Sequence, residues 1–331
     1  MIHLLRLIRF PNLVIIALTM LSVRYALLET LWKQVIGDML DQGYLVQGIR
    51  LHMRTVNFLL LLLSTLLIAA AGYIINDYFD TKTDRINKPD KVVVGRTIKR
   101  RVAMALHLSL SAFALLIAIY LAYKTGNMRL AGIQGFSIAA LWFYSTLLKK
   151  QLLSGNILIA LLAAFVPLTV GIFEFSSGAL PDLEILNLNV SNYGTLLLKR
   201  GAMLIVGFSL FAFLSNLIRE LVKDIEDIEG DLADGCRTLP IVVGEIQAKF
   251  IAMSVVVFTL IVLSFIQVYL WNFNLHVFFS YLLVLVQLPL LILLILLYTA
   301  NTKIHYTRAS LICKLIIVTG VLSMWVFRFT Y

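Results

Sequence analysis

Long apolar runs dominate the chain, and short polar segments separate them. About nine runs approach the roughly 20 apolar residues that a helix needs to cross a bilayer. They lie near 10–28, 55–76, 99–121, 130–148, 152–173, 200–218, 250–271, 275–299 and 309–328. The runs are continuously apolar, whereas strands of a membrane barrel would alternate and be about half as long. The pattern predicts an all-α fold, a polytopic bundle of about nine transmembrane helices.

Composition agrees with this prediction. Of 331 residues, 60% are hydrophobic and only 14% are charged, and the mean hydropathy is +0.92. A soluble domain has about 25% charged residues. The first run follows basic residues but lacks a cleavage site of small residues, so we expect a retained first helix rather than a signal peptide. We expect one membrane domain over 1–331.

Two connecting segments are longer than the rest. Segment 29–54 mixes apolar and charged residues, and we expect it to be a loop that holds an interfacial helix. Segment 174–198 is polar, contains proline and is poor in Lys and Arg, as an external loop should be.

The net charge of +10 has its explanation in topology rather than in nucleic-acid binding. With the N-terminus in the cytoplasm, most Lys and Arg residues fall on the inner side, as the positive-inside rule requires. The densest basic cluster, 82–101, then faces the cytoplasm and anionic lipid. We therefore expect a multi-pass protein of the plasma membrane, with membrane lipids and not nucleic acid as partners.

Acidic residues concentrate in two places on that inner side. Of the 18 Asp and Glu residues, four lie within 77–90 and eight within 220–245. Each cluster holds three aspartates spaced i, i+3 and i+7, which share one face of a helix. The two triplets are Asp77, Asp80 and Asp84, and Asp224, Asp227 and Asp231. Like charges at this spacing destabilise a helix, and more so near a membrane, so a positive partner is expected.

Three kinds of positive partner are open: neighbouring Lys and Arg side chains, calcium, or Mg²⁺ shared with a phosphorylated ligand. Gly230 and Gly235 lack the preceding acids of a calcium loop. Mg²⁺ fits better because it binds through a few carboxylates plus substrate phosphates. Basic side chains that could hold the remaining phosphate oxygens are Arg85, Lys88, Lys91, Arg219 and Lys223.

A metal-bound diphosphate would be a good leaving group, because the metal stabilises the charge that develops on it. If the carbon left behind is allylic, aromatic faces can stabilise the resulting cation. Candidates on adjoining runs are Tyr73, Phe79, Phe136, Trp142, Phe143 and Tyr144. Ordinary packing is the alternative role of each.

Other reactive residue types offer no site. The two cysteines, Cys236 and Cys313, lack metal-site spacing, and no base is evident beside Cys236. We expect Cys236 to be a small buried or loop thiol. The five histidines lie outside both acidic motifs, so we assign no catalytic histidine.

The motifs resemble the two signatures of the UbiA superfamily of intramembrane prenyltransferases. The first is Asn76-Asp77-x-x-Asp80-x-x-x-Asp84, followed by Asn87-Lys88-Pro89-Asp90, and the second is Asp224-x-x-Asp227-x-Glu229-Gly230-Asp231. Supporting matches are Arg9-Phe10-Pro11-Asn12, Tyr144-Ser145-x-x-Leu148-Lys149 and Gly155-Asn156. Lys88-Pro89 departs from the Arg-Pro that members often carry, which keeps the charge but loses a bidentate contact.

The resemblance implies transfer of an isoprenoid chain from its diphosphate to an acceptor inside a helical bundle with a central cavity open to lipid. It implies two Mg²⁺ ions, held by the six aspartates of the triplets. Diphosphate-binding candidates are Asn76, Arg85, Lys88, Lys149, Arg219 and Lys223, and Asn12 would line the acceptor end of the cavity.

Three functions stay open. The second motif, with Thr238-Leu239-Pro240 after it, resembles most the branch that makes digeranylgeranylglyceryl phosphate, whose acceptor is a prenylated glycerol phosphate. The rival acceptors are aromatic quinone precursors such as 4-hydroxybenzoate or dihydroxynaphthoate. A secondary transporter is the non-enzyme alternative, because charges near a membrane also mark transport pathways.

Overall fold

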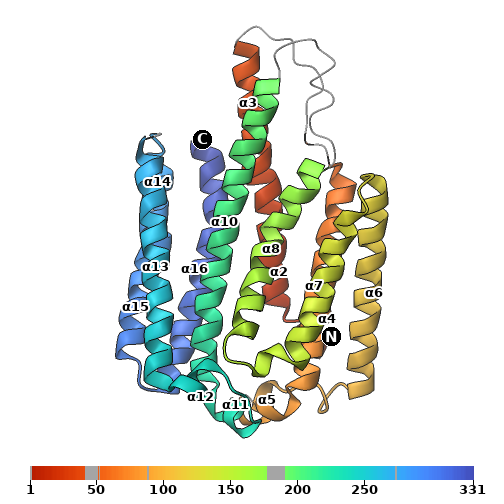
Figure 1. Ribbon diagram of the computed structural model, residues 1–331, viewed down its shortest axis with the longest axis vertical. Helices are drawn as coiled ribbons and strands as arrows, with labels where there is room; N and C mark the ends of the chain where they lie inside the picture. Colours follow the sequence, from red (N-terminus) through yellow and green to blue (C-terminus); the bar gives the residue numbers. More distant parts are fainter. Residues whose placement is uncertain (1, 42–50, 52, 88, 177–190, 273) are drawn as a thin grey trace.

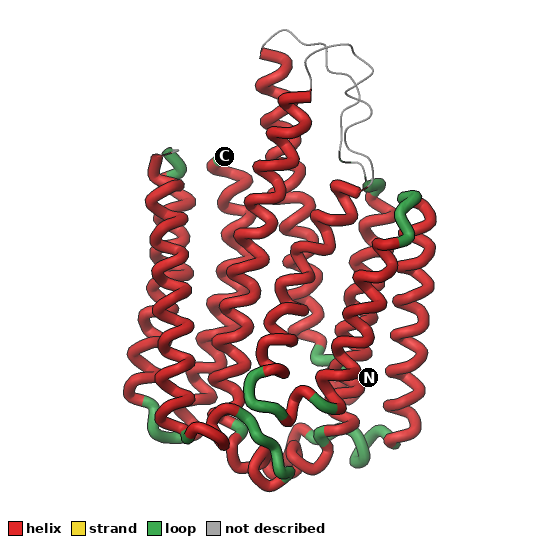
Figure 2. The backbone as a smooth tube through the Cα atoms, in the orientation of Figure 1, coloured by secondary structure: helices red, strands yellow, loops and turns green. Residues whose placement is uncertain are grey.

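A computed structural model describes residues 2–41, 51, 53–87, 89–176, 191–272 and 274–331. Within these ranges the backbone is helical apart from short loops and one isolated bridge between Val94 and Ile98 (Figure 2). The helices are α1 (Ile2–Leu7), α2 (Phe10–Leu21), η1 (Ser22–Leu28), α3 (Glu29–Asp41), α4 (Thr55–Phe79), α5 (Thr81–Asn87), η2 (Pro89–Lys91), α6 (Arg100–Lys124), α7 (Arg129–Thr146), η3 (Leu148–Lys150), α8 (Ser154–Ser176), α10 (Ser191–Glu226), α11 (Ile228–Ala233), α12 (Leu239–Val243), α13 (Glu245–Asn272), α14 (His276–Leu282), η4 (Leu283–Gln287), α15 (Leu288–Thr299) and α16 (Lys303–Thr330).

Eight helical stretches in the described part of the chain are long and apolar enough to cross a membrane. This confirms the predicted all-α, polytopic membrane fold. Helix α7 has 18 residues, occupies the fourth predicted run and connects α6 with α8. It is long enough but is not among those eight apolar stretches. The count of nine therefore stays a prediction.

The prediction that 29–54 begins as a loop with a separate interfacial helix is wrong for Glu29–Asp41. These residues form α3, which continues the first span through the π-helical segment η1 and makes one stretch, Phe10–Asp41. Leu31, Val35 and Met39 lie on one face of α3 and are buried there. That apolar face explains why charged residues on the opposite face do not end the helix. Residues 42–50 lie outside the described part.

The predicted loop 174–198 is also too long at both ends. Helix α8 continues to Ser176, and α10 begins at Ser191 rather than near 200. Glu174 stays inside α8 because its carboxylate is buried and paired: Arg24 Nη1 donates to Glu174 Oε2 at 2.9 Å. Residues 177–190 lie outside the described part.

The helix ends that carry the acidic motifs gather at one end of the bundle. Helix α5 follows α4, α11 follows α10, and α5 packs against α11 (Figure 1). Along the bundle, α10 packs against both α8 and α16. The fully buried side chains of the bundle include Phe58, Phe173 and Ile218. This packing fixes the end of α10 beside the end of α4.

Candidate functional site

The first acidic motif lies where α4 ends and α5 begins, not on one continuous helix. Asn76 and Asp77 lie in the last turn of α4, Asp80 caps that helix, and Asp84 lies on α5. The second motif repeats this arrangement, with Asp224 on α10, Asp227 at the N-cap of α11 and Asp231 on α11. Each motif therefore turns across a helix end and presents carboxylates from two directions.

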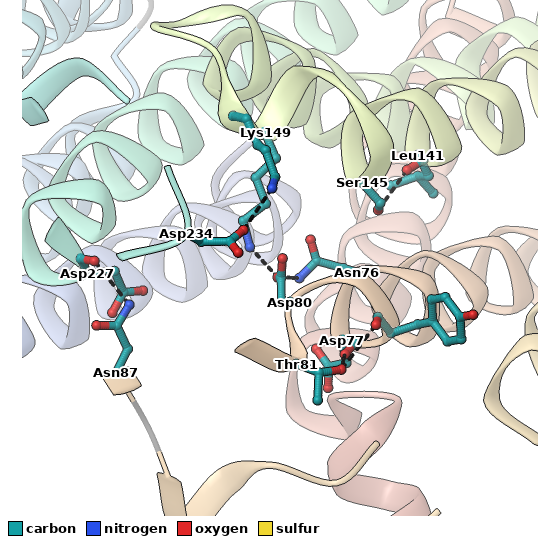
Figure 3. Close-up of polar contacts among 12 residues, drawn as sticks. Asn76, Asp77, Asp80, Thr81, Asn87, Leu141, Ser145, Lys149, Asp227 and Asp234 are labelled. Atoms are coloured by element: carbon teal, nitrogen blue, oxygen red, sulfur yellow. Dashed lines mark hydrogen bonds and ion pairs between the residues drawn. The ribbon is translucent and has the colours of Figure 1, made fainter. Parts of the chain in front are cut away.

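Asp80 is the centre of the polar contacts in the first motif. Its Oδ2 atom accepts a hydrogen bond from Asn76 Nδ2 at 2.6 Å and also pairs with Lys149 Nζ, which comes from η3 (Figure 3). Burial opposes protonation of Lys149, but the negative charge of Asp80 outweighs it and raises the pKa of the ammonium. Lys149 is therefore a fixed positive charge beside this motif.

Asp77 faces a different cation. Arg9 Nη2 donates to Asp77 Oδ1 at 2.8 Å, and the guanidinium lies 5.1 Å from the centre of the Tyr73 ring. Arg9 itself has a left-handed backbone, with φ of 49°, at the junction between α1 and α2. Sequence reasoning assigned a role to Asn12 but none to Arg9, although Arg9 begins the same motif. A basic residue directly before the first span was the available signal.

An amide and a lysine contact acidic residues in and beside the second motif. Asn156 Nδ2, at the start of α8, donates to Asp224 Oδ2 at 2.7 Å. Nearby, Lys150 Nζ lies 2.8 Å from Asp234 Oδ2. Sequence reasoning quoted Asn156 as a match to the family but gave it no role.

Asn87 connects the two motifs directly. Its Nδ2 atom donates to the backbone oxygen of Asp227 at 3.0 Å, and its Oδ1 atom accepts from the backbone N–H of Gly230 at 3.0 Å. A Cβ atom at Gly230 would collide with the Asn87 amide, so only glycine permits this approach. Asn87 therefore fixes α5 against α11, as Figure 3 shows for its bond to Asp227.

Burial disfavours the charged form of one carboxylate in each motif. Burial raises the pKa of Asp84, and the charge of Asp80 adds to the effect. Burial raises the pKa of Asp231 to about 6, although Lys149 opposes the rise. Asn76 Oδ1 is buried without a hydrogen-bond partner. A further cation near these oxygens would satisfy both observations.

The donor set fits Mg²⁺ that is shared with phosphate oxygens. Carboxylate and amide oxygens are the hard ligands that this ion prefers. Among the described residues, however, no three His, Cys, Asp or Glu side chains converge closely enough to hold a metal by themselves. Mg²⁺ commonly binds through one or two carboxylates plus substrate phosphates, so a shared site does not need a complete protein cage.

An internal cavity of about 240 Å³ leads away from this end of the bundle. Helices α2, α4, α7, α8, α10 and α16 line it. Its polar lining lies toward the motifs and includes Arg9, Asn76, Tyr144, Arg219, Glu220 and Lys223, and the remainder is mostly apolar. The cavity can therefore hold a charged head group and an apolar chain in one molecule.

The structure places most of the predicted binding residues at the cavity or beside the first motif. Asn12, Asn76, Arg219 and Lys223 line the cavity, and Lys149 pairs with Asp80. Arg85 is exposed and does not line the cavity. Lys88 lies outside the described residues. Arg219 Nη1 donates to Glu220 Oε1 at 2.8 Å, a pairing that sequence reasoning missed.

Only two of the six candidate aromatic residues, Tyr73 and Tyr144, line the cavity. Phe136 and Phe143 are exposed, and Phe79 stacks edge-on against Trp142 with ring centres 6.2 Å apart. The aromatic lining that sequence reasoning missed consists of Phe165, Phe208 and Phe211. Helix rotation decides which rings face inward, and the uniformly apolar runs do not indicate that rotation.

Both cysteines are buried free thiols. Burial raises the pKa of Cys236 to about 11, so it is a protonated thiol near neutral pH. This agrees with the prediction that Cys236 is not a nucleophile.

The fold and site together define a helical membrane protein whose apolar cavity ends at two acidic motifs. The model of the UbiA prenyltransferase family matches residues 45–327, and the chain belongs to this family. The predicted resemblance and enzyme class, a prenyltransferase, are therefore confirmed.

Individual relatives agree with the family. The chain is 32% identical over 244 residues to the digeranylgeranylglyceryl phosphate synthase of Sulfurisphaera tokodaii, covering 72% of this chain and 76% of that one. A solved structure from work on digeranylgeranylglyceryl phosphate synthase in membranes has a TM-score of 0.59 at 21% identity and covers 98% of both chains. A UbiA homolog from Archaeoglobus fulgidus bound to DMAPP and Mg²⁺ has a TM-score of 0.51 at 16% identity, covering 97% of this chain and 98% of that one. At these identities the two structures establish the fold alone.

Proposed function

We propose that the protein transfers a geranylgeranyl chain from its diphosphate to a hydroxyl of geranylgeranylglyceryl phosphate. The observation that carries the proposal is the meeting of two acidic motifs at the polar end of an apolar cavity, joined by Asn87. Support for the acceptor comes from the relative in Sulfurisphaera tokodaii, which is named as the synthase of digeranylgeranylglyceryl phosphate.

Magnesium is the cofactor in this proposal, in two ions held between the motifs and the diphosphate. The candidate ligands are Asp77, Asp80, Asp84, Asp224, Asp227 and Asp231. The Archaeoglobus fulgidus homolog that was solved with DMAPP and Mg²⁺ supports this assignment. When bound, the metal supplies charge neutralisation of the departing diphosphate.

The protein's own cations share that task. Lys149, Arg219 and Lys223 would donate hydrogen bonds to phosphate oxygens, and Arg9 would orient Asp77. The bond between the allylic carbon and oxygen breaks with its electron pair leaving on the diphosphate. The acceptor oxygen forms the new bond to that carbon, and its proton passes to the released diphosphate.

The remaining residues control access and geometry. Tyr73, Tyr144 and Phe211 line the cavity, where aromatic side chains can stabilise a delocalised allylic cation. The apolar lining excludes water, which would otherwise compete with the acceptor hydroxyl. In this proposal the N-terminus and both motifs face the cytoplasm, and the protein lies in the plasma membrane.

An acceptor comparison in nanodiscs tests the proposal. Purified protein would receive labelled geranylgeranyl diphosphate, Mg²⁺ and one acceptor at a time: geranylgeranylglyceryl phosphate, 4-hydroxybenzoate or dihydroxynaphthoate. We expect labelled ether product with the glyceryl phosphate alone. Product with an aromatic acid instead would contradict the proposed acceptor. Transport of intact donor into sealed proteoliposomes, without product from any acceptor, would contradict the enzyme assignment.

A further inference from the structure

Lys314 lies within the apolar sequence of the last span, where an ionised side chain is costly and usually functional. Its neighbours on both sides, Cys313 and Leu315, are apolar. The Lys314 side chain lines the cavity and is exposed. Neither acidic motif nor the quoted family motifs include this residue.

The depth of Lys314 follows from two contacts between α10 and α16. Near the motif end, Thr307 Oγ1 donates to Glu226 Oε1 at 3.0 Å. Deeper in the bundle, Gly320 faces the ring of Phe211, so closely that a Cβ atom would not fit. Between these contacts the two helices run antiparallel, as Figure 1 shows.

Lys314 is therefore level with Arg219. It lies seven residues beyond Thr307, and Arg219 lies seven residues before Glu226. Both side chains line the cavity, together with Asn216. At a rise of about 1.5 Å per residue, this level is about 8 Å deeper along α10 than Asp224.

The charge of the lining at this depth favours an anion. The cavity lining contains Arg9, Arg219, Lys223 and Lys314 as cations, and Glu220 is its only carboxylate among the described residues. Arg9 forms an ion pair with Asp77 of the first motif. Lys314 comes from α16, a different helix from Arg219 and Lys223, and lies about one and a half helical turns deeper than Asp224, so it can hold a second phosphate while Arg219 and Lys223 hold the diphosphate.

We propose that Lys314, level with Arg219 and Asn216, binds the phosphate of a prenylated glycerol phosphate acceptor. This inference rests on the proposed function and adds a specificity-determining residue to it. The reacting hydroxyl of glycerol lies only one or two carbons from the phosphoester. A phosphate held at this depth leaves that hydroxyl directed toward the allylic carbon, between the acceptor and the metal-bound diphosphate.

The exposed side of Lys314 suits this role. An acceptor that arrives from the membrane carries its phosphate on a greasy chain, and an exposed cation that lines the cavity can bind that phosphate as the chain enters. A phosphate on an ordinary anionic membrane lipid has the same chemistry, so the test must separate the two sources.

The experiment compares Lys314→Met, Lys314→Arg and the wild type in nanodiscs of zwitterionic lipid and, separately, in nanodiscs of anionic lipid. Arg308→Met, which removes an exposed cation of the same helix that does not line the cavity, is the matched control. Steady-state KM values would be measured for the labelled donor, for geranylgeranylglyceryl phosphate and for geranylgeranylglycerol, which lacks the phosphate. Turnover of geranylgeranylglyceryl phosphate by the wild type tests the proposed function, and this test does not depend on the variants.

We expect Lys314→Met to raise the KM for the phosphorylated acceptor at least about tenfold, the effect of one lost charge-assisted hydrogen bond. The KM for the donor and turnover of geranylgeranylglycerol should stay unchanged, and Lys314→Arg should recover most of the loss. Equal effects on both acceptors would overturn the inference, as would no effect in a folded variant. A defect that appears only in anionic nanodiscs would also overturn it, because Lys314 would then bind membrane lipid.

Discussion

Asn87 on α5 bonds to two backbone groups of the second acidic motif: its amide donates to the Asp227 oxygen, and its carbonyl accepts from the Gly230 N–H, each at 3.0 Å. These contacts join segments that lie 140 and 143 residues apart. Asn87 is therefore a direct link between the two carboxylate motifs.

Replacement of Asn87 by Ala should separate the motifs. Two hydrogen bonds are lost and two backbone groups lose their partner, which should lower the free energy of unfolding by about 2 kcal/mol. We expect the larger effect on activity, a fall of at least about tenfold, because misplacement by about 1 Å is costly in a catalytic site. Thermal unfolding and initial rates would measure the two effects. Unchanged activity at full occupancy of both substrates would contradict this role, and Asn301→Ala at an exposed position is the control.

Gly230 gives a second test of the same contact. Gly230→Ala places a methyl group against the Asn87 amide, so α5 and α11 must move apart. We expect lower activity and a lower unfolding temperature. Gly207→Ala is the matched control, since nothing lies within 4 Å of its added Cβ, and Ala stabilises a helix relative to Gly. If both variants behaved alike, the close approach at Gly230 would not matter.

The aspartates should be needed for chemistry and not for folding. We expect Asp77→Asn and Asp227→Asn each to lower prenyl transfer by at least about a hundredfold, because each removes charge that would balance the metal. Their unfolding temperature should stay near that of the wild type. Asp41→Asn, at an exposed position at the end of α3, is the control. Retained activity in either motif variant would remove that residue from the site.

The buried pair Arg24–Glu174 lies apart from the acidic motifs and should serve stability. Its two side chains are each 4% exposed and their charged atoms lie 2.9 Å apart, while Glu174 Oε1 accepts from the Met53 N–H at 3.2 Å. Glu174→Ala leaves a buried guanidinium without this partner and should destabilise the protein by about 3–5 kcal/mol. The pair Lys33–Glu29, whose lysine side chain is 65% exposed, should contribute no more than about 1 kcal/mol. Comparable thermal shifts for Glu174→Ala and Lys33→Ala would contradict this difference.

The spacing of the acidic residues predicted where the site lies, because like charges beside apolar runs require a positive partner. Spacing could not show that each triplet turns across a helix end, since an i, i+3, i+7 pattern reads the same on one helix or two. Asn87 and Asn156 stand in the quoted family matches, but their roles were not predicted, because the role of an asparagine arises from contacts with distant segments. The continuation of α3 was missed because its buried residues, Leu31, Trp32, Val35 and Met39, stand in a segment rich in charge.

The central claim is that both acidic motifs bind one diphosphate together with Mg²⁺. The most direct measurement is the affinity of a non-reactive geranylgeranyl diphosphate analogue for the protein in nanodiscs, with Mg²⁺ present and absent. The account predicts tight, saturable binding that requires Mg²⁺ and that weakens in Asp80→Asn and in Asp231→Asn alike. Binding that is indifferent to Mg²⁺, or that changes with one motif but not with the other, would contradict it.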